Sequence, residues 1–183
     1  MTANLFTEPG KAFENALNNP NALKALIIVI VTGIFLGVPL FLLTGEVLTI
    51  GAYVLVSLIQ WVVLCILLWF GSFMFTKNKR NFKDHSFSEI ASGAGTLWII
   101  ILVAAIVLII GVLAATISTF IVTIICGIII LALAIVYLIF LLILIRTIIE
   151  SSTRGAIVPW IITLIVDIAL LAVLGLALGQ VLI

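Results

Sequence analysis

Long apolar runs are the feature that most limits how this chain can fold. Four of them occupy residues 22–43, 50–75, 97–145 and 156–178. A helix needs about 20 apolar residues to cross the roughly 30 Å hydrocarbon core of a bilayer. The run at 97–145 has 49 residues, which corresponds to about 73 Å of helix at 1.5 Å per residue. That run therefore contains two spans.

Small and hydroxylic residues at 115–119 (Ala-Thr-Ile-Ser-Thr) offer the best division of the longest run. Dividing there predicts an all-α integral membrane protein with five transmembrane helices. The expected spans are residues 22–43, 50–75, 96–116, 119–145 and 156–178. They make up one transmembrane domain, residues 22–183, after an N-terminal segment at 1–21.

Composition supports this class and excludes others. The chain is 66% hydrophobic and 8% charged, whereas soluble domains are about 25% charged, so polar residues are too few to cover a soluble globule. A net charge of +1 without a basic tract argues against nucleic-acid binding. One His and two Cys leave little for a metal site. No HExxH, GxSxG or Walker A sequence occurs, so we expect no cofactor and no enzymatic activity.

The basic residues predict the orientation. All eight precede or open the first span, or lie between the second and third or between the fourth and fifth: Lys11, Lys24, Lys77, Lys79, Arg80, Lys83, Arg146 and Arg154. With five spans, these segments share one side. The positive-inside rule then predicts a cytoplasmic N-terminus and an outer C-terminus. Trp69, Trp98 and Trp160 fall near the same side, where we expect interfacial anchors; Trp61 is deeper and is expected to pack.

Residues 1–21 have the pattern of a short amphipathic helix. Thr7 is a plausible N-cap, and Phe13 and Leu17 share one face. We expect this cytoplasmic segment to lie on the inner membrane surface, with Phe6, Phe13 and Leu17 dipped into the lipid. The alternative is a frayed tail.

A second short helix is predicted between the second and third spans. Ser86 and Glu89 have capping-box spacing, and Ser92-Gly93-Ala94-Gly95 is expected to end the helix. His85 with Asp84 and Glu89 is the one metal-like grouping in the sequence. We interpret it as part of a solvated loop, because zinc sites need three or four ligands.

Asp167 is the ionisable residue nearest the middle of a span. A central Asp costs about 2.5–3.5 kcal/mol on insertion scales, and such residues are functional candidates by default. Thr163 lies one turn earlier, and Gln60 and Thr32 have similar depths in other spans. The four are expected to form an intramembrane polar cluster, with Asp167 facing the bundle interior. Its role is either functional or a set of hydrogen bonds that fixes helix packing.

Two Gly-x-x-x-Gly pairs allow close helix approach, and their residues are Gly33, Gly37, Gly175 and Gly179. Gly111-x-x-x-Ala115 is a weaker version. The pairs serve either packing within one chain, which we favour, or formation of a homo-oligomer. The predicted surface for lipid or partner contact comprises Lys77, Lys79, Arg80, Lys83, Arg146 and Arg154. Membrane topology alone is the simpler reason for these charges.

The layout resembles that of the Yip-domain family, the Ypt/Rab-interacting membrane proteins and their prokaryotic relatives. Residues 8–13, leading to Pro20, are similar to the family's Pro-x-x-x-Phe entry, and residues 151–156 resemble its polar hairpin before the last span. The chain lacks the Asp-Leu-Tyr-Gly-Pro stretch of eukaryotic members. Before the third span, Ser92-Gly93-Ala94-Gly95 replaces a Tyr or Pro that is often seen in the family. The resemblance implies a compact member in a prokaryotic cell membrane without catalytic residues, and Rab binding is not carried over.

Three functional hypotheses follow. The first is a non-catalytic membrane protein that acts in membrane organisation, scaffolding or partner binding, with membrane lipids, a second copy or another membrane protein as partner. The second is a small transporter or channel component that uses Asp167 as an ion or proton site. The third is an accessory subunit of a larger membrane complex.

Overall fold

Five long helices and one short helix make up the fold. The structure is a computed structural model that describes residues 4–76, 85–116, 120–149 and 153–181. The helices in these ranges are α1 (Pro9–Asn18), α2 (Ala22–Thr44), α3 (Leu48–Thr76), α4 (Phe87–Thr116), α5 (Phe120–Ile149) and α6 (Thr153–Val181). Helices α2 to α6 are each long and apolar enough to cross a membrane. The predicted all-α fold with five spans is therefore confirmed.

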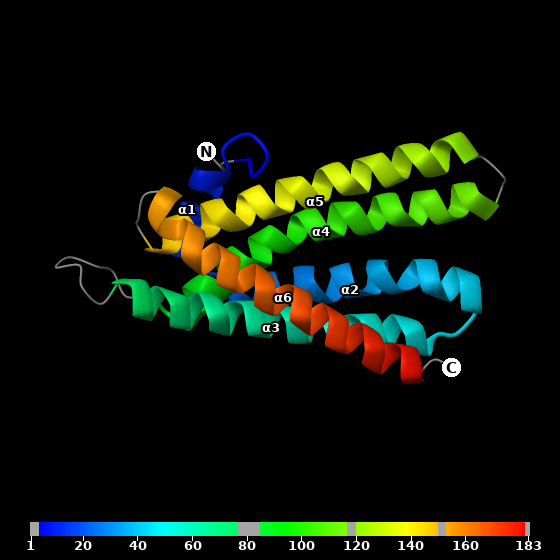
Figure 1. Cartoon of the computed structure of the whole chain (residues 1–183), viewed down its shortest axis with the longest axis horizontal. Coiled ribbons are helices and arrows are strands. Elements are labelled where there is room, and N and C mark those ends of the chain that lie inside the picture. The colour runs from blue at the N-terminus through cyan, green and yellow to red at the C-terminus, as the bar shows by residue number, and fades with distance from the viewer. Residues whose placement is uncertain (1–3, 77–84, 117–119, 150–152, 182–183) are drawn as a thin grey trace.

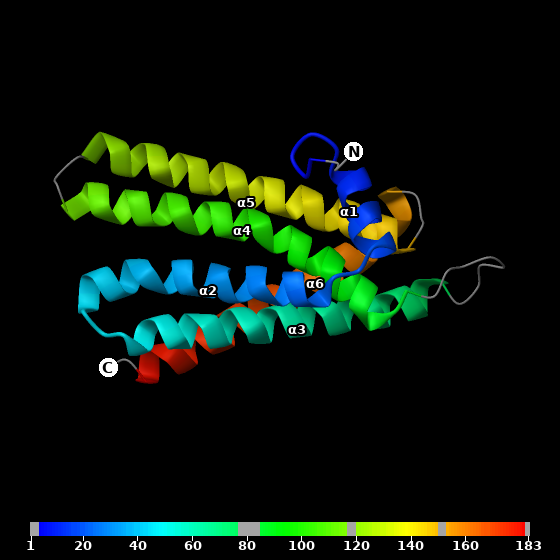
Figure 2. The same ribbon diagram turned by 180° about the vertical axis from the view of Figure 1, so that it is seen from behind.

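The long helices run side by side in an elongated bundle (Figure 1). Helix α2 packs along both α3 and α4, and α4 packs along α5. Helix α6 starts beside the end of α5, crosses the bundle and finishes near the start of α3, as both views show (Figures 1 and 2). One end of the bundle holds α1, the starts of α2, α4 and α6, and the ends of α3 and α5. We call it the basic end, because Lys11, Lys24, Arg146 and Arg154 lie in these segments.

The predicted division of the longest apolar run is confirmed, since α4 ends at Thr116 and α5 begins at Phe120. The predicted break at residues 92–95 is wrong, because α4 continues through it. A Cβ built on Gly95 would lie 2.7 Å from the Cα of Ala25 in α2. A Cβ on Gly93 would lie 3.0 Å from Cδ1 of Leu144 in α5. These small residues therefore allow close helix approach, which outweighs the low helix propensity of glycine.

Helix α1 packs on the protein itself. Its first residue is Pro9, a favoured N1 residue, so Glu8 and not Thr7 occupies the N-cap position. Phe13 and Leu17 share a face, as predicted, and are only 0% and 2% exposed. The Phe13 ring meets Phe140 of α5 edge-on, with centroids 6.4 Å apart. The expectation that Phe13 and Leu17 dip into lipid is therefore wrong, because α4 and α5 cover them.

The first glycine pair brings α2 against α3. A Cβ on Gly33 would lie 2.6 Å from the Cα of Val54, and one on Gly37 would lie 2.6 Å from the Cα of Ile50. Both glycines are buried. They therefore serve packing within the chain. Gly175 and Gly179 lie in α6, and their packing is not described.

The tryptophans divide between surface and core. Trp69 is exposed, in keeping with an interfacial anchor, and Trp61 is buried, as expected. Trp98 is 2% exposed and belongs to the core, so its predicted role as an anchor is wrong. The sequence indicates how deep a residue lies along a helix, but it does not indicate the direction in which the side chain points. Trp160 donates its indole N–H to the carbonyl oxygen of Leu138 at 3.0 Å, which ties α6 to α5.

Candidate functional site

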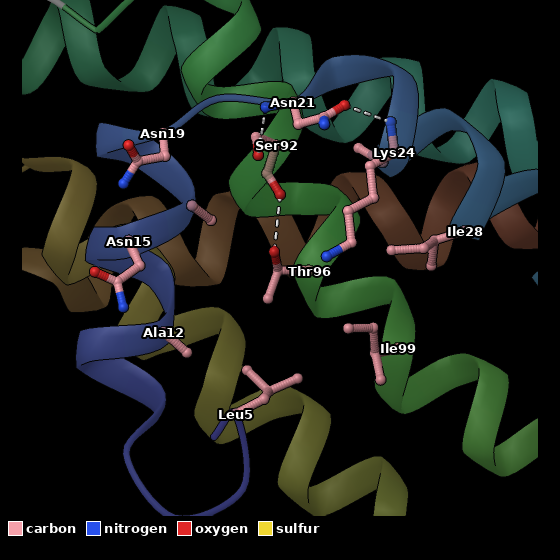
Figure 3. A pocket seen from close by; sticks show the side chains of 12 residues that line it. Leu5, Ala12, Asn15, Asn19, Asn21, Lys24, Ile28, Ser92, Thr96 and Ile99 are labelled. Atoms are coloured by element: carbon pink, nitrogen blue, oxygen red, sulfur yellow. Dashed lines mark hydrogen bonds between the residues drawn. The ribbon is translucent and has the colours of Figure 1, made fainter. Parts of the chain in front are cut away.

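A pocket of about 610 Å³ opens at the basic end between α1, α2 and α4 (Figure 3). Segments far apart in the sequence build it, because α1 packs against α4 while α2 runs along the same helix. Its lining comprises Leu5, Ala12, Asn15, Ala16, Asn19, Asn21, Lys24, Ala25, Ile28, Ser92, Thr96 and Ile99. The pocket therefore exists only in the folded chain.

Hydrogen bonds fix the wall between α2 and α4. Asn21 is the N-cap of α2, and its Oδ1 accepts the backbone N–H of Lys24 at 2.8 Å. The backbone N–H of Asn21 donates to Oγ of Ser92 at 3.3 Å, and the Thr96 hydroxyl donates to the carbonyl oxygen of Ser92 at 3.0 Å. The bond between Asn21 and Ser92 joins the start of α2 to α4, and the other two bonds lie within one helix each. The pocket is therefore preorganised on that side.

The chemistry of the lining changes across the pocket. Lys24 provides a cation, and Asn15 and Asn19 provide amide groups that can donate or accept hydrogen bonds. Figure 3 shows the Lys24 side chain reaching back along the wall on the side of Thr96. Ile28 and Ile99 supply an apolar side. None of the lining residues that the structure describes carries a carboxylate, so the electrostatic preference is for an anion.

The sequence did not single out this site. In the sequence, Lys24 contributes only to the predicted orientation. The residues that surround it in the pocket come from three separated segments, so no local pattern brings them together. One signal was present: Asn15, Asn19 and Asn21 lie within seven residues around a proline. Asparagines next to a proline are also typical of helix ends, where they cap the helix, and Asn21 does cap α2. Only the packing of α1 on α4 shows that the cluster also faces a cavity.

The basic residues predicted to contact lipid or a partner are placed only in part. Arg146 lies in the last turn of α5 and Arg154 near the start of α6, and both are exposed at the basic end. Lys77, Lys79, Arg80 and Lys83 lie outside the described residues. Outside that set, Lys11 pairs with Glu8 at 2.9 Å on the surface of α1.

Two of the predicted intramembrane polar residues, Thr32 and Thr163, lie in helices that do not contact each other in the part of the chain that the structure describes. Thr32 is buried in α2 and donates to the carbonyl oxygen of Ile28 at 2.7 Å. Thr163 is buried in α6 and donates to the carbonyl oxygen of Pro159 at 2.8 Å. Within the described residues, α2 and α6 make no contact. Both hydroxyls thus satisfy their hydrogen bonds within their own helices.

Asp167 has a neighbour that the sequence did not indicate. It is partly buried in α6 and interacts electrostatically with Tyr137 of α5. Gln60 is partly buried in α3. Tyr137 was missed because aromatic residues in an apolar run are ordinarily packing residues. The α5–α6 contact therefore includes an acid and a phenol as well as the hydrogen bond from Trp160 to Leu138.

His85 belongs to the folded part of the basic end. It is only 8% exposed, and its Nδ1 lies 2.7 Å from Oε2 of Glu89, one turn into α4. The interpretation as a solvated loop is therefore wrong for His85. The capping prediction is confirmed, because the backbone N–H of Glu89 donates to Oγ of Ser86 at 3.3 Å. Asp84 lies outside the described residues, and those that are described contain no group of three or more His, Cys, Asp and Glu able to hold a metal.

Comparison of the chain with known protein families, with curated proteins and with solved structures found no match.

Proposed function

We propose that this chain is a non-catalytic membrane protein that resembles the Yip domain and organises lipids or protein partners at its basic end. In this proposal the basic end faces the cytoplasm of a prokaryotic cell, as the positive-inside rule favours. The bundle serves as the anchor, and α1 with the adjoining helix ends serves as the contact surface.

The burial of α1 on the bundle is the observation that carries this proposal. An interfacial helix needs only lipid to cover its apolar face. Here Phe13 and Leu17 are covered by α4 and α5, which leaves Lys11 and Glu14 exposed on a fixed surface. A rigid surface is favoured for recognition because little conformational entropy is lost when a partner binds.

Copurification at native expression tests the proposal. A partner should cofractionate with the chain in a fixed ratio after extraction in mild detergent. The variant Arg146→Gln with Arg154→Gln should weaken this association, while six of the eight basic residues maintain the charge asymmetry. Glu46→Gln, at the opposite end in the α2–α3 connection, is the matched control. A chain that fractionates alone, or a partner equally retained by the double variant, contradicts partner binding at this surface.

A second candidate function uses Asp167. Its proximity to Tyr137 in the α5–α6 contact favours a proton or ion site in a small transporter or channel component, since intramembrane acids often mark ion pathways. The chain reconstituted in vesicles should then carry a proton or cation flux that Asp167→Asn abolishes. Equal flux in the two proteins, or none above empty vesicles, rejects this function.

A further inference from the structure

We propose that the pocket between α1, α2 and α4 binds one anionic membrane phospholipid, with its phosphate at Lys24 and the start of an acyl chain against Ile28 and Ile99. This inference deepens the proposed function and rests on it in one respect, namely that the basic end lies at a membrane surface. It does not depend on a protein partner.

The depth of the pocket favours a lipid. Lys24 lies in the first turn of α2, which begins at Ala22 and is long enough to cross a bilayer. A lysine at the end of a membrane helix places its ammonium group at the level of the headgroups. The polar part of the pocket therefore lies where phospholipid phosphates are concentrated.

The charges favour an anionic headgroup. Lys24 makes no ion pair with any acid that the structure describes, whereas Lys11 is engaged by Glu8. Asn21 caps α2 beside it, and the positive end of the α2 dipole points the same way. Amide groups of Asn15 and Asn19 complete the polar side. A phosphate there would gain a charge-assisted contact and neutral hydrogen bonds.

The apolar side favours a lipid over a soluble phosphate compound. Ile28 lies one turn beyond Lys24 on α2, and Ile99 lies one turn beyond Thr96 on α4. The lining thus changes from polar to apolar over one helical turn, about 5 Å, in the direction of the bilayer centre. A volume of about 610 Å³ is that of a site for a sizeable organic ligand. A phospholipid has the same sequence of charge, polar linker and hydrocarbon.

Lys24→Gln is the decisive variant, and Lys11→Gln is its matched control. Both substitutions remove one positive charge at the same end, and Lys11 does not line the pocket. Purified protein in neutral detergent is titrated with short-chain phosphatidylglycerol or with phosphatidylcholine of the same chain length, and bound lipid is counted by native mass spectrometry. We expect one phosphatidylglycerol per chain and at least about tenfold weaker binding in Lys24→Gln, the loss typical of one charge-assisted contact. Lys11→Gln should bind as the wild type does.

Two outcomes of this titration overturn the proposal. One is equal binding of the two lipids by the wild type. The other is an equal loss in Lys24→Gln and Lys11→Gln, which indicates a diffuse surface-charge effect. Neither result depends on copurification, so a failure here leaves the partner proposal standing, and a failure to find a partner leaves the lipid site standing.

Two further measurements test whether the acyl chain of the lipid contributes to binding in the pocket. Glycerol phosphate added at the lipid concentration should not displace the bound lipid; displacement would assign the pocket to a soluble phosphate compound. Ala16→Phe fills the pocket without a change of charge and should abolish lipid binding. Protection of Cys65 and Cys126, both buried, from a thiol reagent reports that this variant is folded. A folded Ala16→Phe protein that still binds one lipid places the lipid elsewhere and overturns the proposal.

Discussion

The close contact of α2 with α3 gives a quantitative prediction for Gly33→Ala and Gly37→Ala. The new Cβ in each would lie 2.6 Å from a backbone Cα of α3, about 0.8 Å short of the 3.4 Å at which ordinary contact begins. A backbone atom cannot rotate away as a side chain can, so α2 must move from α3. Overpacking of this kind costs about 1–3 kcal/mol, and we expect the upper part of that range.

Gly127→Ala is the matched control. Nothing lies within 4 Å of a Cβ at Gly127 in α5, and all three substitutions gain the same helix propensity, up to about 1 kcal/mol. The difference from the control therefore isolates the steric cost. At about 2–4 °C per kcal/mol for a chain of this size, a difference of about 2–3 kcal/mol lowers the thermal midpoint by roughly 4–12 °C.

A thiol-reactive dye measures the midpoint, because Cys65 and Cys126 are buried until the protein unfolds. The double variant Gly33→Ala with Gly37→Ala should lose less than the sum of the two single variants, because one displacement of α2 relieves both clashes. Midpoints of the single variants equal to that of Gly127→Ala would refute the packing argument. Additive losses would refute the shared displacement.

Three further predictions, the first with its own control variant, are tested in the same assay. Phe13→Ala removes a fully buried ring and should cost about 3–5 kcal/mol; Phe6→Ala, at a site 49% exposed, should cost clearly less, and equal losses would count against the docking of α1. Trp160→Phe removes the hydrogen bond to Leu138 and should cost about 0.5–1.5 kcal/mol; an unchanged midpoint would mean that this bond does not stabilise the α5–α6 contact. Asn21→Ala removes the cap of α2 and should cost about 0.5–2 kcal/mol, with a gain in stability as the contrary result.

Features along the chain axis were predictable from the sequence. The length of the apolar runs predicts the number of helices, and the hydroxylic cluster at 115–119 predicts the division between α4 and α5, because both depend on local composition. Amphipathic spacing likewise predicts that Phe13 and Leu17 lie on one face. It does not tell whether lipid or protein covers that face, since both are apolar.

Features that depend on neighbouring helices were not predictable in the same way. Gly93 and Gly95 have the sequence pattern of helix breakers. Only the packing of α1, α2 and α5 against them shows that they allow close helix approach. The pocket around Lys24 is built by residues from 5 to 99, and no local pattern specifies that juxtaposition. Asp167 was identified by its depth, whereas Tyr137 beside it depends on how α6 crosses α5.

The docking of α1 also has a consequence for biogenesis. Phe140, which packs on Phe13, follows it by 127 residues. At about 5–20 residues per second, roughly 6–25 s of synthesis separate the two rings. During this interval the apolar face of α1 has no α5 to pack on and must be shielded by the lipid surface or a chaperone. Helix α1 therefore completes its tertiary contacts only after α5 has emerged from the ribosome and entered the membrane.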